Sequence, residues 1–182
     1  MRGFRIAGLG LAAALVAAPV VAQQSVGLEV RAGMAVPTFD IADVAKAGPV
    51  FGAGLSLPLG DRLRLLADVD LGTHEVKGTN LDVKVNHFMG KLGYRLAQSS
   101  NGKLEVYGNL GAGIMTFKVD TPGAESSSYF AINAGAKIYY HFSDKLGLVI
   151  SPQGDIAFQD EADFGASTAW VWPFTAGLRI TF

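Results

Sequence analysis

The stretch "TAWVWPFTAGLRITF", residues 168–182, carries the pattern that decides the fold. From Trp170 to Phe182 every second residue is apolar or aromatic, and the residues between them are mostly small or polar. A period of two predicts a β-strand with one apolar face. The segment is also much longer than the average strand of about 5–6 residues.

Seven earlier segments show the same alternation, and breaks rich in turn residues separate them. Short breaks such as "GDR" at 60–62 and "FSDK" at 142–145 alternate with longer polar ones such as those at 37–48 and 118–128. Short turns at one end and long loops at the other predict an up-and-down antiparallel meander. The expected strands lie near residues 25–36, 49–59, 62–74, 83–96, 103–117, 129–142, 145–158 and 169–182.

The composition excludes several classes of function. The net charge is only −1 and charged residues make up 17% of the chain, so no basic field exists to attract nucleic acid. The chain has no cysteine, which excludes disulfides, thiolate metal sites and thiol catalysis. We expect no nucleic-acid partner and no cofactor.

The amino terminus predicts a secretory signal. Arg2 and Arg5 precede an uncharged apolar run, and Val20 and Ala22 are small enough for signal-peptidase cleavage before Gln23. A permanent transmembrane helix needs about 20 apolar residues, and a proline interrupts this run earlier. We therefore expect a signal peptide at 1–22, removed on export, and one domain at 23–182.

Which face of the sheet meets water decides between a soluble and a membrane barrel. A soluble barrel of the lipocalin type would turn its apolar face inward. The segments, however, are long enough to cross a hydrocarbon core, which takes about 9–11 residues, and glycines concentrate on the charged face, as a narrow lumen requires. Aromatic residues form two girdles of the kind found at lipid–water interfaces. They are Tyr94, Tyr140, Phe142 and Phe182 near the short turns, and Phe51, Phe117, Phe130, Phe158, Trp170 and Trp172 near the long loops.

In lipid a sheet must close, because each unpaired backbone group at an open edge costs several kcal/mol. The predicted fold is all-β: an eight-stranded antiparallel up-and-down transmembrane β-barrel in the outer membrane of a Gram-negative-type envelope, with both chain ends on the periplasmic side. The ending "GLRITF" at 177–182 resembles the last strand of the small OmpA/OmpX-type, porin-like β-barrel domain family. The resemblance implies that Phe182 is an assembly signal read by the barrel-assembly machinery. Outer-membrane lipid is the other expected partner, and we expect a monomer.

Charged residues on the inner face define the candidate site. Five acids face six bases, so the lumen is nearly neutral, whereas an ion-selective pore is usually biased to one sign. Balance favours a lumen plugged by ion pairs, with a structural or loop-mediated surface role and no enzymatic activity; the alternative is a passive channel for small solutes. The predicted ion-pair network comprises Glu29, Arg31, Arg64, Asp68, Asp70, Lys91, Arg95, Glu105, Lys137, Asp155 and Arg179, with His87 and His141 as possible additions.

Two further motifs have both a functional and an ordinary structural explanation. His141 and Ser143 in "HFSD" have the spacing of lipid-modifying hydrolases, but the motif is expected in a turn and Gln153 stands where the orienting acid belongs, so a hydrolase is the third alternative. His74 and His87 flank a loop with Glu75 and Asp82, a weak metal signal; we expect no catalytic residue and no metal site. The acids of "QDEAD" at 159–163 fit a solvated loop better than a calcium or lipopolysaccharide site.

Three irregularities are expected in the strands. Pro152 and Pro173 lie inside segments without a free edge, so each predicts a bulge or a locally lost ladder bond. Val83 and Val85 alternate out of phase with Phe88 and later apolar residues, which predicts a bulge near Asn86.

Overall fold

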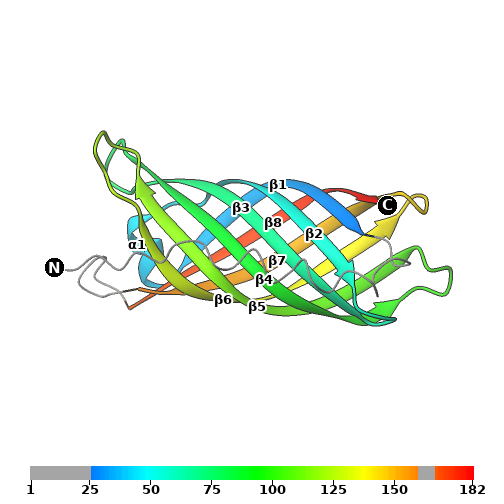
Figure 1. The fold of residues 1–182 in the computed structure, drawn as a ribbon. Helices are drawn as coiled ribbons and strands as arrows, with labels where there is room; N and C mark the ends of the chain where they lie inside the picture. Colours follow the sequence, from blue (N-terminus) through cyan, green and yellow to red (C-terminus); the bar gives the residue numbers. More distant parts are fainter. Residues whose placement is uncertain (1–25, 160–166) are drawn as a thin grey trace.

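The computed structural model describes residues 26–159 and 167–182. Eight antiparallel strands close into a barrel in the order β1-β2-β3-β4-β5-β6-β7-β8, with β8 pairing back onto β1 (Figure 1). This confirms the predicted fold class. The strands are β1 (Gly27–Thr38), β2 (Gly48–Pro58), β3 (Leu63–Glu75), β4 (Asp82–Gln98), β5 (Leu104–Val119), β6 (Ser127–His141), β7 (Leu146–Phe158) and β8 (Thr168–Thr181).

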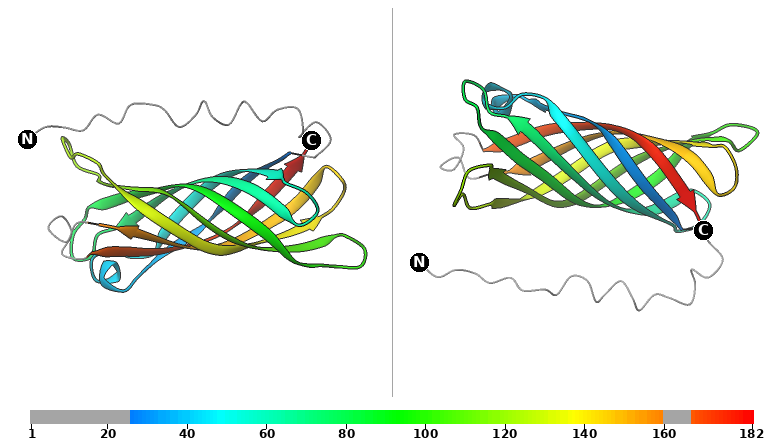
Figure 2. Two further views of the ribbon diagram at one scale, coloured as in Figure 1. Left: turned by 60° about the horizontal axis from the view of Figure 1, so that its bottom comes forward. Right: turned by 90° about the horizontal axis from the view of Figure 1, so that it is seen from above.

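The two ends of the barrel differ. The β2–β3, β4–β5 and β6–β7 connections and the C-terminus lie at one end, which we call the short-turn end (Figures 1 and 2). The opposite end, the long-loop end, holds the other connections, including the five-residue helix α1 (Asp40–Val44) between β1 and β2. In the described ranges, no helix is long and apolar enough to cross a membrane.

The two faces of the barrel wall have opposite chemistry. Along β1, Glu29 and Arg31 are buried inside, whereas Leu28 and Val30 are exposed on the outside. The same alternation runs round the barrel, because a strand's side chains point alternately to its two faces. The outer surface is therefore an apolar belt, and the interior carries the charges. Exposed aromatic residues include Phe51, Tyr94, Phe130, Tyr140, Phe142, Phe158 and Phe182.

Phe117 is a correction to the predicted aromatic girdle. It is only 3% exposed and lies inside the barrel in a cluster with Met115 and Val85. The reason is parity: Phe117 falls on the same face of β5 as Glu105 and Tyr107, which face the lumen. An aromatic residue at a strand end can therefore cap the lumen instead of anchoring the barrel in the interface.

The predicted bulge near Asn86 is also wrong. β4 pairs with β3 without a register shift from Asp82 to Tyr94, and its only shift against β5 lies between Arg95 and Ala97. Val85 is apolar yet faces inward, because the lumen is apolar at the long-loop end. A change from polar to apolar along the inner face, with no change of register, produced the misleading pattern.

Both internal prolines interrupt their ladders, as predicted. The β6–β7 pairing stops between Gly135↔Gln153 and Ile138↔Ile150, around Pro152. The β7–β8 pairing stops between Pro152↔Phe174 and Asp155↔Val171, a gap that includes Pro173. Register is the same on both sides of each gap, so ladder pairs are lost without a bulge, because proline has no N–H to donate.

The predicted signal peptide and most of the acidic loop, 160–166, lie outside the described residues.

Candidate functional site: the barrel lumen

A cluster of ion pairs crosses the lumen. Lys137 on β6 lies 2.6 Å from Glu29 on β1 and 2.8 Å from Asp68 on β3. Neither β1 nor β3 is a sheet neighbour of β6, so these contacts span the interior instead of following the wall. Lys137 is fully buried, and each carboxylate is 2% exposed.

The forked donors of Arg31 join these two carboxylates to a third, that of Asp70. Nη1 of Arg31 lies 2.7 Å from Glu29 and 2.9 Å from Asp68, and Nη2 lies 3.0 Å from Asp70. Lys91 adds a contact of 2.9 Å to Asp68. The planar guanidinium suits this role because its donors are held in a fixed geometry. We call this set the charged cluster: Glu29, Arg31, Asp68, Asp70, Lys91 and Lys137.

A second layer of side chains lies next to the charged cluster and is largely uncharged. Oε1 of Gln153 accepts hydrogen bonds from Lys91 at 3.1 Å and from Asn109 at 2.8 Å. Asn109 also donates to Asn133, which donates to Asp155. Asp155 in turn lies 2.7 Å from Nδ1 of His87. This amide layer links strands β4, β5, β6 and β7 by an unbroken series of hydrogen bonds across the lumen.

Apolar side chains fill the lumen at the long-loop end. Met89, Met115 and Phe117 pack there with Val85 and Val171, all 4% exposed or less. Small residues on the facing strands let these large side chains meet at the centre. The remaining members of this apolar layer are Ala35, Val50, Ala131, Ala157 and Ala169.

The short-turn end carries a separate group of charges around one acid. Glu105 lies 3.0 Å from Arg95, 3.1 Å from His141 and 3.4 Å from Arg64. Two tyrosines separate this group from the charged cluster: Tyr107 and Tyr139 pack edge to face with ring centroids 5.7 Å apart. The hydroxyl of Tyr139 donates to Glu29 at 2.9 Å and so joins the two layers.

Glycines on the inner face make room for the long charged side chains. A Cβ on Gly52 would lie 2.0 Å from Oδ1 of Asp70, and one on Gly54 would lie 2.5 Å from Oδ1 of Asp68. Nη2 of Arg31 would lie 3.1 Å from the Cβ on Gly52, and Nη1 of Arg31 would lie 2.7 Å from the Cβ on Gly54. Any side chain at position 52 or 54 would therefore overlap the ion pairs of the charged cluster.

The structure distributes the eleven charged residues of the sequence prediction over three places. Six form the charged cluster, Asp155 belongs to the amide layer, and Arg64, Arg95 and Glu105 meet at the short-turn end. Arg179 lies between the charged cluster and the short-turn group, 3.6 Å from Glu29. The prediction omitted Asn109, Asn133, Gln153 and Tyr139, although their inward positions in the alternation would have identified them.

The hydrolase motif takes a different geometry from a triad. Oγ of Ser143 accepts hydrogen bonds from the backbone N–H groups of Lys145 and Leu146, as in an ordinary turn. The acid beside His141 is Glu105, from the preceding strand, and not a residue of the next strand. Within the described ranges, no hydrogen bond joins His141 to Ser143.

The residues of the weak metal signal also find other partners. Glu75 pairs with Lys46 at the surface, and Nδ1 of His74 bonds the backbone carbonyl of Lys46 at 2.9 Å. His87 faces Asp155 in the lumen. Among the residues that the structure describes, no group of three or more histidines and acids has the arrangement of a metal site.

A closed eight-stranded barrel with an apolar outer belt and a polar interior defines a transmembrane β-barrel. The family model of the outer membrane protein β-barrel domain matches residues 8–180, and the chain belongs to this family. Its location is the outer membrane. No curated protein sequence matches the chain.

Solved structures share the fold at low sequence identity. The Neisserial surface protein A superposes with a TM-score of 0.71 at 14% identity, over 86% of this chain and 97% of that one. A major outer membrane protein of Thermus thermophilus gives 0.61 at 14% identity, over 87% and 99%. Ail, the attachment invasion locus protein of Yersinia pestis, gives 0.53 at 17% identity, over 86% and 97%. At these identities the likeness concerns the fold alone.

Proposed function

We propose that the chain is a non-enzymatic outer-membrane barrel whose lumen is closed by its own side chains, and that it acts structurally or through its long loops. The observation that carries the proposal is the contact of Lys137 with Glu29 and Asp68 across the interior. The amide layer and the apolar layer add two further obstructions between this contact and the long-loop end. An apolar constriction also opposes ion passage by excluding water.

The long-loop end supports a surface role because parts of it are ordered against one another. Residue 45 forms a β-bridge with residue 76, and Lys46 pairs with Glu75, so the first two long loops are joined. Phe39 is exposed yet packs against Trp170, with ring centroids 5.1 Å apart. Such a platform suits contact with other envelope components.

Two further proposals concern assembly and oligomeric state. Phe182 is exposed on the outer surface at the end of β8, and its N–H bonds the carbonyl of Val26 at 3.0 Å, next to the β1–β8 seam. We propose that the barrel-assembly machinery reads this strand. Every strand has two paired neighbours, so no open sheet edge calls for a second copy, and we propose a monomer.

Osmotic swelling of liposomes tests the closed lumen against the channel alternative. Residues 23–182 are refolded into liposomes, which are then challenged with small sugars and amino acids, with a conducting porin at the same protein-to-lipid ratio as control. The proposal predicts the swelling rate of empty liposomes. Swelling that rises with the amount of barrel would overturn it and establish the channel.

A loop-trimmed barrel separates the structural role from the loop-mediated one. The described loop at 76–81, which carries the β-bridge to residue 45, is replaced by a two-residue turn, and the variant is expressed in a host that lacks the native chain. Restored resistance of the envelope to detergent would favour the barrel over this loop platform, whereas a defect despite normal membrane levels would assign the role to the platform.

A further inference from the structure

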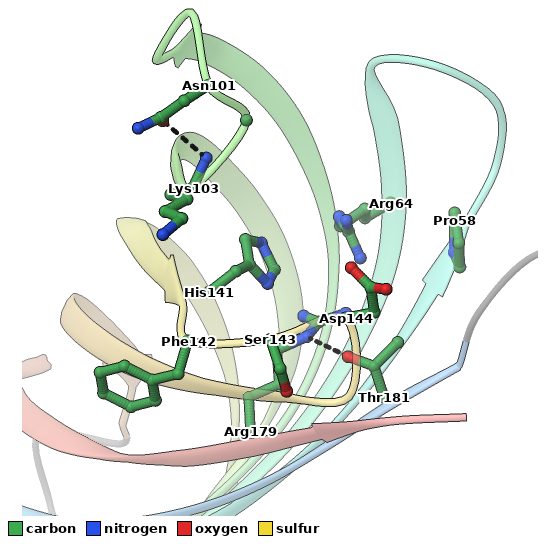
Figure 3. Close-up of a pocket in the computed structure, with 11 residues that line it drawn as sticks. Pro58, Arg64, Asn101, Lys103, His141, Phe142, Ser143, Asp144, Arg179 and Thr181 are labelled. Atoms are coloured by element: carbon green, nitrogen blue, oxygen red, sulfur yellow. Dashed lines mark hydrogen bonds between the residues drawn. The ribbon is translucent and has the colours of Figure 1, made fainter.

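A hollow opens into the lumen at the short-turn end. It has a volume of about 630 Å³, and its walls come from β2, β3, β6, β8 and two of the short turns (Figure 3). We call it the vestibule. The side chains that matter here are Arg64, Lys103, His141, Asp144 and Arg179.

The vestibule has an excess of positive charge. Three formal cations, Arg64, Lys103 and Arg179, line it against the single carboxylate of Asp144. Two further acids lie beside the vestibule. Glu105 is shared among Arg64, Arg95 and His141. Glu29, 3.6 Å from Arg179, is already paired with Arg31 and Lys137. Neither carboxylate is therefore free to neutralise the wall. A concave site lined by one sign of charge focuses its field and concentrates ions of the opposite sign.

Aromatic rings position the two arginines. The guanidinium of Arg179 lies 4.4 Å from the centroid of Tyr139, and that of Arg64 lies 5.7 Å from the same ring and 4.9 Å from Tyr107. Cation–π contacts orient a guanidinium without using its N–H donors. The donors of both arginines are therefore held in place and remain largely available.

The hydrogen bonds of the two arginines are few and long. Arg179 donates from Nε to Thr181 at 3.4 Å, and Arg64 donates from Nη2 to Glu105 at 3.4 Å. Nη1 of Arg179 is buried and makes no hydrogen bond within the described residues; its ion pair to Glu29 is 3.6 Å long. Each guanidinium carries five N–H donors, so the two arginines keep an unusual number of unused hydrogen-bond donors for a buried or half-buried site.

We propose that the vestibule is a binding site for a phosphate group, reached from the short-turn side of the membrane. A guanidinium can pair its forked donors with two oxygens of a phosphate, and two ring-oriented guanidiniums line the vestibule together with Lys103 and His141. The proposal concerns the mouth of the barrel and stands whether or not the lumen conducts.

Calorimetric titration with pyrophosphate tests the site. Residues 23–182 are refolded in maltoside micelles, which contain no phosphate, and the Arg64→Gln variant is compared with Lys145→Gln. Both changes remove one cation from the short-turn end, but Lys145 does not line the vestibule. We expect saturable binding that Arg64→Gln weakens at least about tenfold and Lys145→Gln by less than about twofold.

Two further arms complete the test. Arg64→Lys keeps the positive charge but loses the planar pair of N–H donors. We expect its affinity to lie between those of the native barrel and Arg64→Gln. Repeating the titration in phosphatidylcholine nanodiscs identifies the source of the phosphate: weaker binding there means that lipid headgroups compete for the site, and equal binding means a soluble ligand. Absence of saturable binding, or equal losses in Arg64→Gln and Lys145→Gln, would overturn the proposal.

Discussion

Nζ of Lys137 lies 2.6 Å from Oε2 of Glu29 although the two residues are 108 positions apart in the chain and stand on strands that do not pair. The ammonium group also contacts Asp68, so one buried cation joins three strands of the barrel wall. Two buried charges with no water to solvate them stabilise a structure only as a pair. The contact therefore ties β6 to β1 and β3 through the lumen, although neither β1 nor β3 pairs with β6.

Lys137→Met is expected to destabilise the folded barrel by about 3–5 kcal/mol, because Glu29 and Asp68 lose a buried counter-charge. The free energy of unfolding is measured by urea titration in lipid, followed by the shift of the folded band on unheated gels. Lys145→Met is the matched control, since Lys145 is exposed in the β6–β7 turn and makes no ion pair among the described residues.

Adding Glu29→Gln to Lys137→Met checks that the loss comes from this pair. The double variant should lose clearly less stability than the sum of the two single variants, because each change removes the charge that the other leaves unpaired. Additive losses would mean that the two side chains act independently, and the pairing across the lumen would then contribute nothing.

Gly52→Ala is expected to reduce the yield of folded barrel sharply. The new methyl group would lie 2.0 Å from Asp70 and 3.1 Å from Arg31, whose positions the charged cluster holds. Gly90→Ala makes the same chemical change where a Cβ meets only one backbone oxygen, at 3.8 Å, so its refolding yield should be near normal. Equal yields would show that the lumen has spare room at Gly52.

Met115→Ala should cost about 2–5 kcal/mol, the usual range for truncating a fully buried methionine. Met34 offers a control with the same chemistry on the lipid-facing surface, where it is 47% exposed. Urea unfolding of both variants is compared with that of the native barrel. A loss at Met34 as large as that at Met115 would contradict a packed apolar layer inside the barrel.

Phe182→Ala is expected to lower the rate of assembly by the barrel-assembly machinery in reconstituted proteoliposomes. Phe174→Ala is the control, because Phe174 is a second exposed aromatic residue on the outer face of β8. A general need for aromatic anchors would slow both variants equally. The prediction requires a selective defect in Phe182→Ala, with spontaneous refolding unchanged.

The alternation of residues was enough to predict the closed barrel, because a period of two assigns each residue to a face without knowledge of its neighbours. It places Glu29 and Arg31 on one side of β1, and both are buried in the lumen. The alternation carries no information on which strands face each other across the interior, so the contact of Lys137 with Glu29 could not be predicted from it. That contact depends on the register of all eight strands.

The errors arose where the inner face changes character along its length. Val85 and Phe117 are lumen residues in the apolar layer, and their hydrophobicity made them look like outward residues. In a membrane barrel the interior is usually assumed to be polar, and this one is apolar at the long-loop end. An apolar lumen residue can be told from a lipid-facing one only by counting every second residue strictly along β4 and β5.

Single-channel recording tests the central claim most directly. Residues 23–182 are refolded into planar bilayers, and insertion is verified in the same preparation by the gel shift of the folded barrel. If the charged cluster, the amide layer and the apolar layer close the lumen as proposed, inserted barrels should carry no current above that of the bare bilayer. Discrete, reproducible conductance steps would contradict the closed lumen and assign the protein to the channels.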